Sequence, residues 1–350
     1  MPFDCVVSRS GGPDVLVVRD RPPSPLGAGQ VRVRVAYSGV NFADLAARAG
    51  VYGPAPKPPF APGFEVSGVV AEADPATGFS PGDRVLAVSR FGGYTSELVT
   101  EAVRVRKIPA DMQLDEAAAL PAQYLTAWHA LTELCRVRKG ESVLIHAAAG
   151  GVGTAAVQIC RELGLDSYGT ASTREKIAYA TSQGLRHGIV ASEEDFVSAT
   201  KRLTGGRGVD VVLDANGGSS FAKSFDCLAP GGKLVVFGAA QAMPRSLKAL
   251  GDLPKTALAL AQQKKWGAFE LIEKNASVMG LQILLLWDQV ELLSKELDSL
   301  LFLCSTGRIR PVVDRIFPLA EAAEAHRYLH ARRTKGKVLL RCDPPTGAEG

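Results

Sequence analysis

The sequence of 350 residues lacks the marks of several protein classes. No apolar run is long enough to span a membrane, and the first ten residues, MPFDCVVSRS, do not have the pattern of a signal peptide. The six cysteines are scattered without a CxxC pair, which argues against a disulfide framework or a structural zinc lobe. The net charge of +4 is not gathered in a basic block, so no nucleic-acid partner is expected. These absences favour a cytoplasmic protein with reduced thiols.

The residue sets of hydrolases are missing too, since neither a Ser-His-Asp set, paired carboxylates nor a reactive-cysteine context can be recognised. The composition, 46% apolar and 22% charged residues, is that of a globular protein, and the length favours two domains. The first third is predicted to be rich in β-structure. Strand-like runs occur at VRVRVAYS (31–38), EVSGVVAEA (65–73) and DRVLAVS (83–89), and a helical stretch follows at roughly 114–135.

From residue 141 onward, strand-like and helix-like segments alternate. SVLIHA is followed by VGTAAVQICRELG, in which apolar residues recur at helical spacing. Further strands are predicted at DSYGTAS, GVDVVLDANG (208–217) and GKLVVFGAA (232–240). This alternation is typical of an α/β fold with a doubly wound parallel sheet.

The chain beyond residue 240 is less regular. Segment 241–272 fits neither half of the chain cleanly. The following NASVMGLQILLL is predicted to be helical, and KGKVLLRC (335–342) is predicted to form a final strand.

The stretch SVLIHAAAGGVG (142–153) joins a predicted strand to a predicted helix through small residues. Ala148, Gly150 and Gly153 occupy the three positions of the dinucleotide fingerprint GxGxxG, with alanine at the first. Glycine at the second position lets the backbone approach a pyrophosphate, and glycine at the third lets the helix pack closely on the strand. A tight structural turn is the alternative. The strand before the turn and the helix after it favour a dinucleotide site formed by Ala149, Gly150, Gly151, Val152 and Gly153.

The end of the second strand indicates which dinucleotide is bound. NAD-binding sites usually have an acid there, about 20 residues beyond the glycines, to accept hydrogen bonds from the ribose. This chain has ASTREK (171–176), with no acid at the strand end and with Ser172 and Lys176 just beyond it. Hydroxyl and ammonium groups suit a 2′-phosphate and so favour NADPH. The alternative is the solvated first turn of a helix.

These motifs resemble those of the zinc-free quinone oxidoreductases, the zeta-crystallin-like branch of the medium-chain dehydrogenase/reductases. Segment 241–272 and NASVMGLQILLL look most like the vesicle-amine-transport-protein-like subgroup. The resemblance covers nearly the whole chain, through GVNFADLAARAGVYG (39–53), PGFEVSGVV (62–70), PGDRV (81–85), YLTAW (124–128), GTASTREK (169–176) and KGKVLL (335–340).

The resemblance implies a fold of two domains. Residues 1–122 and 289–350 would form a β-rich GroES-like catalytic domain, and residues 123–288 a Rossmann domain with an insertion at about 241–272. Members of the family bind NADPH in the cleft and are commonly dimers, so a homodimer is expected.

No metal site is expected. Zinc-dependent members of the superfamily carry cysteine and histidine ligands near the front of the chain, and this sequence has Asn41 and Phe64 at the corresponding places. Neither side chain replaces such a ligand. Glu65 remains, but one carboxylate does not make a metal site.

The resemblance also assigns the residues around the reacting groups. Asn41 and Thr126 match residues beside the nicotinamide ring and its ribose, and Tyr52 matches an aromatic residue at the substrate mouth. The alternatives are a turn asparagine, a helix-interior threonine and a loop aromatic. On the cofactor side the resemblance implies contacts from Ser172, Lys176, Asn216, Phe237 and Gly238.

Three further residues bear on this assignment. Ala191 stands where quinone reductases often place a tyrosine near the adenosine phosphate, which predicts a weaker preference for NADPH. His129 and His146 are interpreted as structural, because they fall on an apolar helix and at a strand end.

The function predicted from these features is NADPH-dependent, zinc-independent reduction of a quinone or similar conjugated carbonyl compound, of the EC 1.6.5 type. One alternative is an alkene reductase acting on enals, enones or enoyl thioesters. Another is an NADPH-binding interaction protein with little turnover, in which Trp266, Phe269 and Leu271 contact a partner or a membrane surface. A packed lid or dimer contact is the favoured interpretation of that segment.

Overall fold

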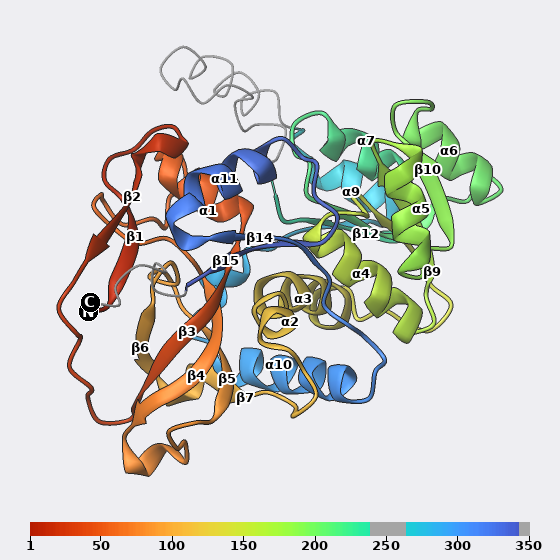
Figure 1. The fold of residues 1–350 in the computed structure, drawn as a ribbon. Coiled ribbons are helices and arrows are strands. Elements are labelled where there is room, and N and C mark those ends of the chain that lie inside the picture. Colours follow the sequence, from red (N-terminus) through yellow and green to blue (C-terminus); the bar gives the residue numbers. More distant parts are fainter. Residues whose placement is uncertain (239–263, 343–350) are drawn as a thin grey trace. The chain divides into compact units, whose positions relative to one another are not determined.

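The computed structural model describes residues 1–238 and 264–342, which form two units (Figure 1). The first unit contains Met1–Ala122 and residues 284–342, so it is built from both ends of the chain. The second unit contains residues 123–238 and 264–283. Most of segment 241–272, the expected insertion, lies outside the described residues.

The first unit is built on a seven-stranded sheet with the order β14-β15-β3-β4-β5-β7, in which β6 also pairs with β3. The strands predicted near the front of the chain are present, and alternate residues of β3, such as Val31 and Val33, are buried as the pattern requires. The strands are β1 (Phe3–Val7), β2 (Leu16–Asp20), β3 (Gln30–Val40), β4 (Glu65–Ala73), β5 (Arg84–Val88), β6 (Glu97–Glu101), β7 (Val105–Lys107), β14 (Val313–Pro318) and β15 (Lys337–Arg341). The helices are α1 (Phe42–Ala49), α2 (Leu114–Ala118), α10 (Val290–Ser305) and α11 (Ala322–His330).

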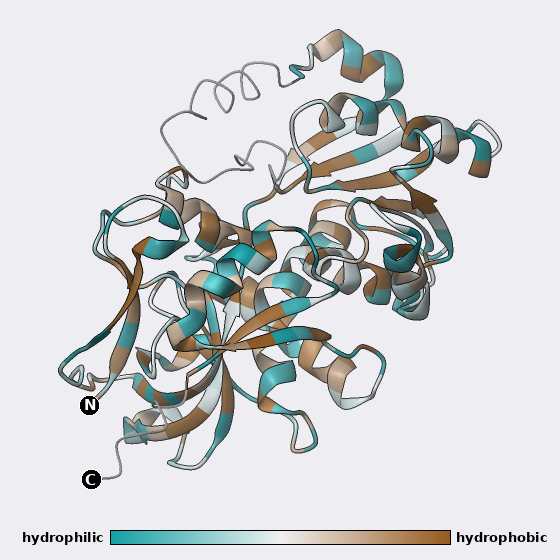
Figure 2. Ribbon diagram, turned by 45° about the horizontal axis from the view of Figure 1, so that its top comes forward, coloured by the Kyte–Doolittle hydropathy of each residue, from teal (hydrophilic) through white to brown (hydrophobic). Residues whose placement is uncertain are grey.

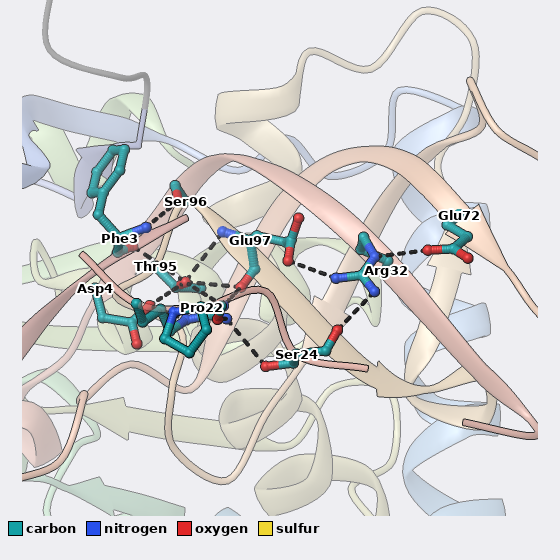
Figure 3. A network of polar contacts seen from close by, with 10 residues as sticks. Phe3, Asp4, Pro22, Ser24, Arg32, Glu72, Thr95, Ser96 and Glu97 are labelled. Carbon is teal, nitrogen blue, oxygen red and sulfur yellow. Dashed lines mark hydrogen bonds and ion pairs between the residues drawn. The ribbon is translucent and has the colours of Figure 1, made fainter. Parts of the chain in front are cut away.

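Polar side chains tie the β1–β2 hairpin and strand β6 to the rest of this unit (Figure 3). Arg32 on β3 pairs with Glu97 on β6 over 2.7 Å and with Glu72 on β4 over 3.0 Å. Thr95 donates to the Asp4 carboxylate of β1 over 2.6 Å. These contacts fix the outer strands around the sheet that carries the candidate site.

The second unit contains a six-stranded parallel sheet with the order β10-β9-β8-β11-β12-β13. Its central strands are buried apolar runs, as expected of a sheet covered on both faces, and the sheet is largely brown in Figure 2. The strands are β8 (Ser142–Ile145), β9 (Asp166–Ala171), β10 (His187–Val190), β11 (Val209–Asp214), β12 (Leu228–Val236) and β13 (Ser277–Gly280). The helices are α3 (Pro121–Trp128), which begins two residues before this unit, α4 (Gly151–Glu162), α5 (Arg174–Ser182), α6 (Phe196–Leu203), α7 (Ser220–Asp226) and α9 (Ala268–Lys274).

One secondary-structure prediction was wrong. NASVMGLQILLL is not a helix, because its first half forms the edge strand β13, and Ile283–Leu286 forms a short 3-10 turn. Helix α9 ends at Asn275 in the left-handed conformation (φ 51°), which turns the chain into β13. Pairing with β12 decides the outcome, since an apolar run of this length fits either structure by periodicity.

The described end of the insertion packs only in part. The rings of Trp266 and Phe225 lie 5.8 Å apart, and Leu271 packs on the same apolar cluster. Phe269 is 81% exposed and Ile272 is 69% exposed. None of the helices in the described ranges combines the length and the apolarity needed to cross a bilayer.

Candidate functional site

Four strand ends of the parallel sheet lie side by side in the second unit. Strands β9, β8, β11 and β12 are neighbours in that order and run in the same direction. The residues that follow them therefore meet at the carboxyl edge of the sheet, where open α/β sheets bind ligands. This edge brings together the cofactor residues predicted from the sequence, Ala149, Gly150, Gly151, Val152, Gly153, Ser172, Lys176, Asn216, Phe237 and Gly238.

The turn between β8 and α4 has glycines at positions 151 and 153 because side chains there would collide with neighbouring atoms. A Cβ atom on Gly153 would lie 2.2 Å from the carbonyl oxygen of Ala147, and one on Gly151 would lie 1.9 Å from Gln123 Nε2. Gly150 is the N-cap of α4 and has no side chain to cover the first N–H groups of the helix. The turn thus presents backbone donors at the positive end of a helix dipole, an arrangement that fits a pyrophosphate.

Arg174 and Lys176, the two cations just beyond strand β9, differ in exposure, since Arg174 is exposed and Lys176 is half-buried. Both Arg174 nitrogens Nε and Nη2 are hydrogen bonded to the Glu193 carboxylate, over 2.8 and 2.6 Å. Lys176 is half-buried in the first turn of α5, and Ser172 is exposed just before that helix. Ala191 donates its N–H to the carbonyl of Ala171, the last residue of β9, over 2.9 Å. The alanine therefore lies beside the strand end, where the resemblance placed a tyrosine.

The ends of β11 and β12 are joined through Asp214. Its Oδ1 atom accepts from the N–H of Asn216 over 2.7 Å, and its carbonyl accepts from the N–H of Phe237 over 3.1 Å. A Cβ atom on Gly238 would lie 2.7 Å from the carbonyl oxygen of Ala215. These contacts hold the two strand ends close together at the carboxyl edge of the sheet.

A buried histidine lies beneath this edge. His146 Nδ1 is 3.0 Å from Thr170 Oγ1, and its Nε2 is 2.9 Å from Ser224 Oγ, which in turn donates to Asp214 over 2.6 Å. Burial lowers the pKa of His146, while the Asp214 carboxylate opposes this shift. The hydrogen bonds link three neighbouring strands and fit the structural role predicted for this residue.

Thr126 also belongs to the second unit. It lies on α3 and is 9% exposed, and it is three residues beyond Gln123, the side chain that packs on the glycine turn. Residues three apart share one face of a helix. His129 is 5% exposed, as expected of a structural residue.

In the first unit, Asn41 is held by two charged side chains. Strand β15 pairs with β3 so that Val338 lies opposite Val40, and the next pair in this antiparallel register is Lys337 and Asn41. The Lys337 ammonium donates to Asn41 Oδ1 over 2.7 Å and also to Glu65 Oε1. Asn41 Nδ2 donates to the same Glu65 oxygen over 3.0 Å. Both functional groups of the Asn41 side chain are therefore fixed.

Glu65 and Lys337 form a completely buried ion pair, since both side chains are 0% exposed. The second oxygen of Glu65 accepts from the N–H of Ala122 over 2.6 Å. The carboxylate fits only because residue 39 is glycine, as a Cβ atom there would lie 2.3 Å from Glu65 Oε1. A buried charge needs such partners, because an unpaired one costs several kcal/mol.

Asp44 fixes the backbone of the same site. Its carboxylate accepts from the N–H of Asn41 and from that of Gly63, each over 2.8 Å. Burial raises the pKa of Asp44 to about 7, and the two N–H groups and the Lys337 charge oppose the shift. Asp44 is thus a titratable group close to neutral pH, three residues from Asn41.

Tyr52 belongs to an aromatic cluster beside these polar residues. Its half-buried ring lies 6.3 Å from that of Phe64, which lies 5.1 Å from Phe91. Phe91 in turn meets Phe60 edge to face at 5.6 Å. Phe60 and Phe64 are buried, so Tyr52 and Phe91 are the rings of this cluster that remain half-buried.

These residues do not fit zinc. Among the described residues, no group of three or more His, Cys, Asp or Glu side chains is placed to hold a metal ion. At the two positions expected for ligands in zinc-dependent relatives, the oxygen of Asn41 accepts from an ammonium group and the Phe64 ring packs on other rings. An ammonium already bound to Asn41 and Glu65 opposes a second cation.

Three polar residues of these sites were not among those predicted from the sequence, namely Lys337, Asp44 and Gln123. The sequence did carry a signal for Lys337, because a lysine at the start of the apolar strand KVLLR is unusual. Asp44 follows Asn41 by three residues, the spacing at which a side chain caps a helix start. Gln123 carries no such signal.

Comparison with known proteins agrees with this architecture. The family model "Alcohol dehydrogenase GroES-like domain" matches residues 27–125, and the model "Zinc-binding dehydrogenase" matches residues 183–340. The human synaptic vesicle membrane protein VAT-1 homolog is 37% identical over 339 residues, which are 96% of this chain and 85% of that protein. The chain belongs to the medium-chain dehydrogenase/reductases. This confirms the family, the GroES-like and Rossmann domains, and the likeness to the vesicle-protein subgroup.

Two further members of the medium-chain family are informative. A 2-haloacrylate reductase of a Burkholderia species is 35% identical over 97% of this chain and 99% of its own length. The crystal structure of Escherichia coli quinone oxidoreductase, solved as a complex with NADPH, has a TM-score of 0.85 and 29% identity, covering 97% of this chain and 99% of that one. The zinc named in one family model does not fit the residues of this chain described above.

Proposed function

We propose that the protein is an NADPH-dependent reductase that delivers hydride to a quinone or a similar conjugated carbonyl compound without a metal ion. The observation that carries the proposal is the carboxyl edge of the parallel sheet, where a bare glycine turn lies beside a second strand end that has no acid. The NADPH complex of the Escherichia coli neighbour supports the choice of cofactor.

The residues of that edge would hold the cofactor. The backbone from Ala149 to Gly153 would bind the pyrophosphate, and Ser172 and Lys176 would bind the 2′-phosphate. Asn216, Phe237 and Gly238 would line the remainder. When bound, NADPH supplies the hydride, and the protein supplies position and a dry environment.

The acceptor would meet Asn41 and Tyr52 of the first unit. One Nδ2 proton of Asn41 is used by Glu65, and the other, which has no hydrogen bond within residues 1–238 and 264–342, would bind an acceptor oxygen or a ribose hydroxyl. The Tyr52 ring would bind a flat, conjugated acceptor by stacking. Asp44 has a pKa near neutral pH, but its side chain is completely buried and accepts from two backbone N–H groups. Water would therefore protonate the reduced acceptor.

The test is NADPH oxidation by the purified protein with a panel of acceptors. We expect turnover with quinones, slower turnover with enones, and weaker activity with NADH. If no acceptor of either class is reduced while NADPH binds, the protein is a binding protein, as the interaction-protein alternative predicts.

Alkene reduction is the second candidate, and the 2-haloacrylate reductase relative favours it. Product analysis separates the two, since an alkene reductase saturates the C=C bond of an enone and leaves its carbonyl, whereas quinones yield hydroquinones.

We also propose a cytoplasmic homodimer, which sedimentation of the purified protein and fractionation of cells would test.

A further inference from the structure

We propose that Lys337 is a positioning residue, whose buried ammonium fixes the Asn41 carboxamide so that an N–H group, and not the carbonyl oxygen, faces the ligand. The inference deepens the proposed function and rests on it only for the identity of the ligand. Lys337 comes from the last strand of the first unit, 296 residues beyond Asn41 in the chain.

The charges around Asn41 permit only one orientation of its amide. In the observed orientation, Oδ1 accepts from the Lys337 ammonium and Nδ2 donates to the Glu65 carboxylate. Rotating the amide by half a turn would place the NH₂ group against the ammonium and the oxygen against the carboxylate. Both contacts would then be repulsive, and both buried charges would lose a partner. The pair therefore sets the amide so that its second N–H group, and not its oxygen, remains to bind a ligand.

A donor at this place suits the chemistry of conjugated carbonyl reduction. The hydride forms a C–H bond with a carbon of the acceptor through its own electron pair. A π-electron pair of the conjugated system then moves onto the carbonyl oxygen. That oxygen carries a negative charge until water protonates it. An N–H stabilises the charge, whereas a carbonyl oxygen at the same place would repel it. Lys337 also balances the charge of Glu65, which would otherwise oppose the developing oxyanion.

The test variant removes both members of the ion pair together. Removing Lys337 alone would leave the Glu65 carboxylate buried without its partner, and the protein could simply unfold. Glu65→Gln with Lys337→Met keeps the approximate volumes and leaves no buried charge. The matched control is Asp83→Asn with Lys107→Met, which removes a lysine–carboxylate pair of 2.8 Å at the surface of the same unit.

The first measurement needs no catalysis. The chain contains three asparagines, Asn41, Asn216 and Asn275, so protein labelled with ¹⁵N at asparagine gives three side-chain amide signals. Loss of one signal in Asn41→Ser assigns Asn41. We expect its two amide protons to have well-separated shifts and slow exchange in the wild type and in the control. In the Glu65→Gln/Lys337→Met variant they should converge and exchange about tenfold faster or more, because the hydrogen bonds that protect them are lost.

The second measurement compares acceptors. The double variant should lose kcat by about tenfold to a hundredfold on weakly electrophilic enones, which need most help at the oxyanion, and less on readily reduced quinones. Its KM values should change little, and the surface control should match the wild type.

Two results would overturn the positioning role, namely unchanged Asn41 signals in the double variant or an equal loss on every acceptor. If instead the wild type reduces no acceptor while the Asn41 signals respond as expected, the proposed function fails and the positioning of Asn41 stands.

Discussion

At the scale of single residues, we expect Lys176 to determine the preference between the two nicotinamide cofactors. Arg174 is already engaged by Glu193, so it has less capacity to bind a phosphate. A charge-assisted hydrogen bond from Lys176 to the 2′-phosphate would contribute about 1.5–3 kcal/mol, or roughly tenfold to somewhat over a hundredfold in affinity. We expect Lys176→Ala to weaken NADPH binding by that factor and to leave NADH binding nearly unchanged, as measured by titration with both cofactors.

Arg174→Ala is the matched control for that experiment. It removes a neighbouring cation and should cost much less NADPH affinity, because its guanidinium pairs with Glu193. An equal loss of both cofactors in a folded Lys176→Ala protein would contradict the assignment. So would tighter binding of NADH than of NADPH by the wild type.

Asp44 makes the stability of the protein depend on pH in an unusual direction. Burial raises its pKa to about 7, against about 3.9 for an unfolded aspartate. Between these values the native state holds a proton that the unfolded state has lost, so stability falls as pH rises and levels off above about pH 7. Lys337, Glu65 and Tyr94 are the ionisable groups that share this environment.

Asp44→Asn removes the titration. We expect the unfolding free energy of the wild type, relative to this variant, to fall by on the order of 2 kcal/mol between pH 5 and pH 8. Urea unfolding at both pH values measures the difference, and other carboxylates cancel in the comparison. Parallel pH dependences of the two proteins would show that Asp44 is ionised throughout.

At the scale of elements, the turn between β8 and α4 depends on close packing. Alanine at position 153 would gain about 1 kcal/mol of helix propensity, but its Cβ would lie 2.2 Å from the carbonyl oxygen of Ala147. The steric clash is expected to outweigh this gain in helix propensity, since overpacking costs about 1–3 kcal/mol of stability. We expect Gly153→Ala to lower stability and to weaken NADPH binding by about tenfold or more, measured by thermal unfolding and cofactor titration.

Gly280→Ala is the control in the same unit. A Cβ atom on Gly280 meets no other atom within 4 Å, so this change should leave both stability and cofactor binding close to wild type. If Gly153→Ala behaved like Gly280→Ala, the turn would tolerate a side chain and would not be the pyrophosphate site.

The elements that could be predicted from the sequence are those with a clear period or strong end signals. The strands near Val31 and Val143, helix α4 and the glycine turn were all recognised in this way. Strand β13 was not, because Val278 and its neighbours form an apolar run that pairing with β12, rather than periodicity, makes into a strand.

The features of the candidate site also divide into those that the sequence predicts and those that it does not. The cofactor residues each follow a strand, so parallel order alone predicts that they meet at one edge. The contacts of Asn41 could not be predicted, because they depend on the register that brings Lys337 beside it from the far end of the chain. Sequence reasoning assigned Asn41 to the ligand and could not say which atoms of its amide are already used.

At the scale of the whole molecule, the chain has the medium-chain fold, and Asn41 and Phe64 stand where zinc ligands of zinc-dependent relatives are expected. One family model carries zinc in its description, yet Asn41 and Phe64 have no place for the ion, and Lys337 binds the groups nearest to it. We expect NADPH oxidation and the thermal midpoint to be unchanged after exhaustive chelation, and added zinc to bring no increase in rate. Loss of turnover on chelation, restored by zinc and not by magnesium, would contradict this.

Lys337 is the last member of its site to be synthesised. The ribosome adds the 272 residues that separate it from Glu65 at about 5–20 residues per second, a delay on the order of tens of seconds. Throughout that time the nascent chain has no ammonium for Glu65, and β3 lacks its neighbour β15. The strands of the second unit, from Ser142 to Gly280, have all been made before then. The unit that carries the glycine turn can therefore fold while later residues are still being added, whereas the unit that carries Asn41 is completed only after Lys337 and strand β15 have been made.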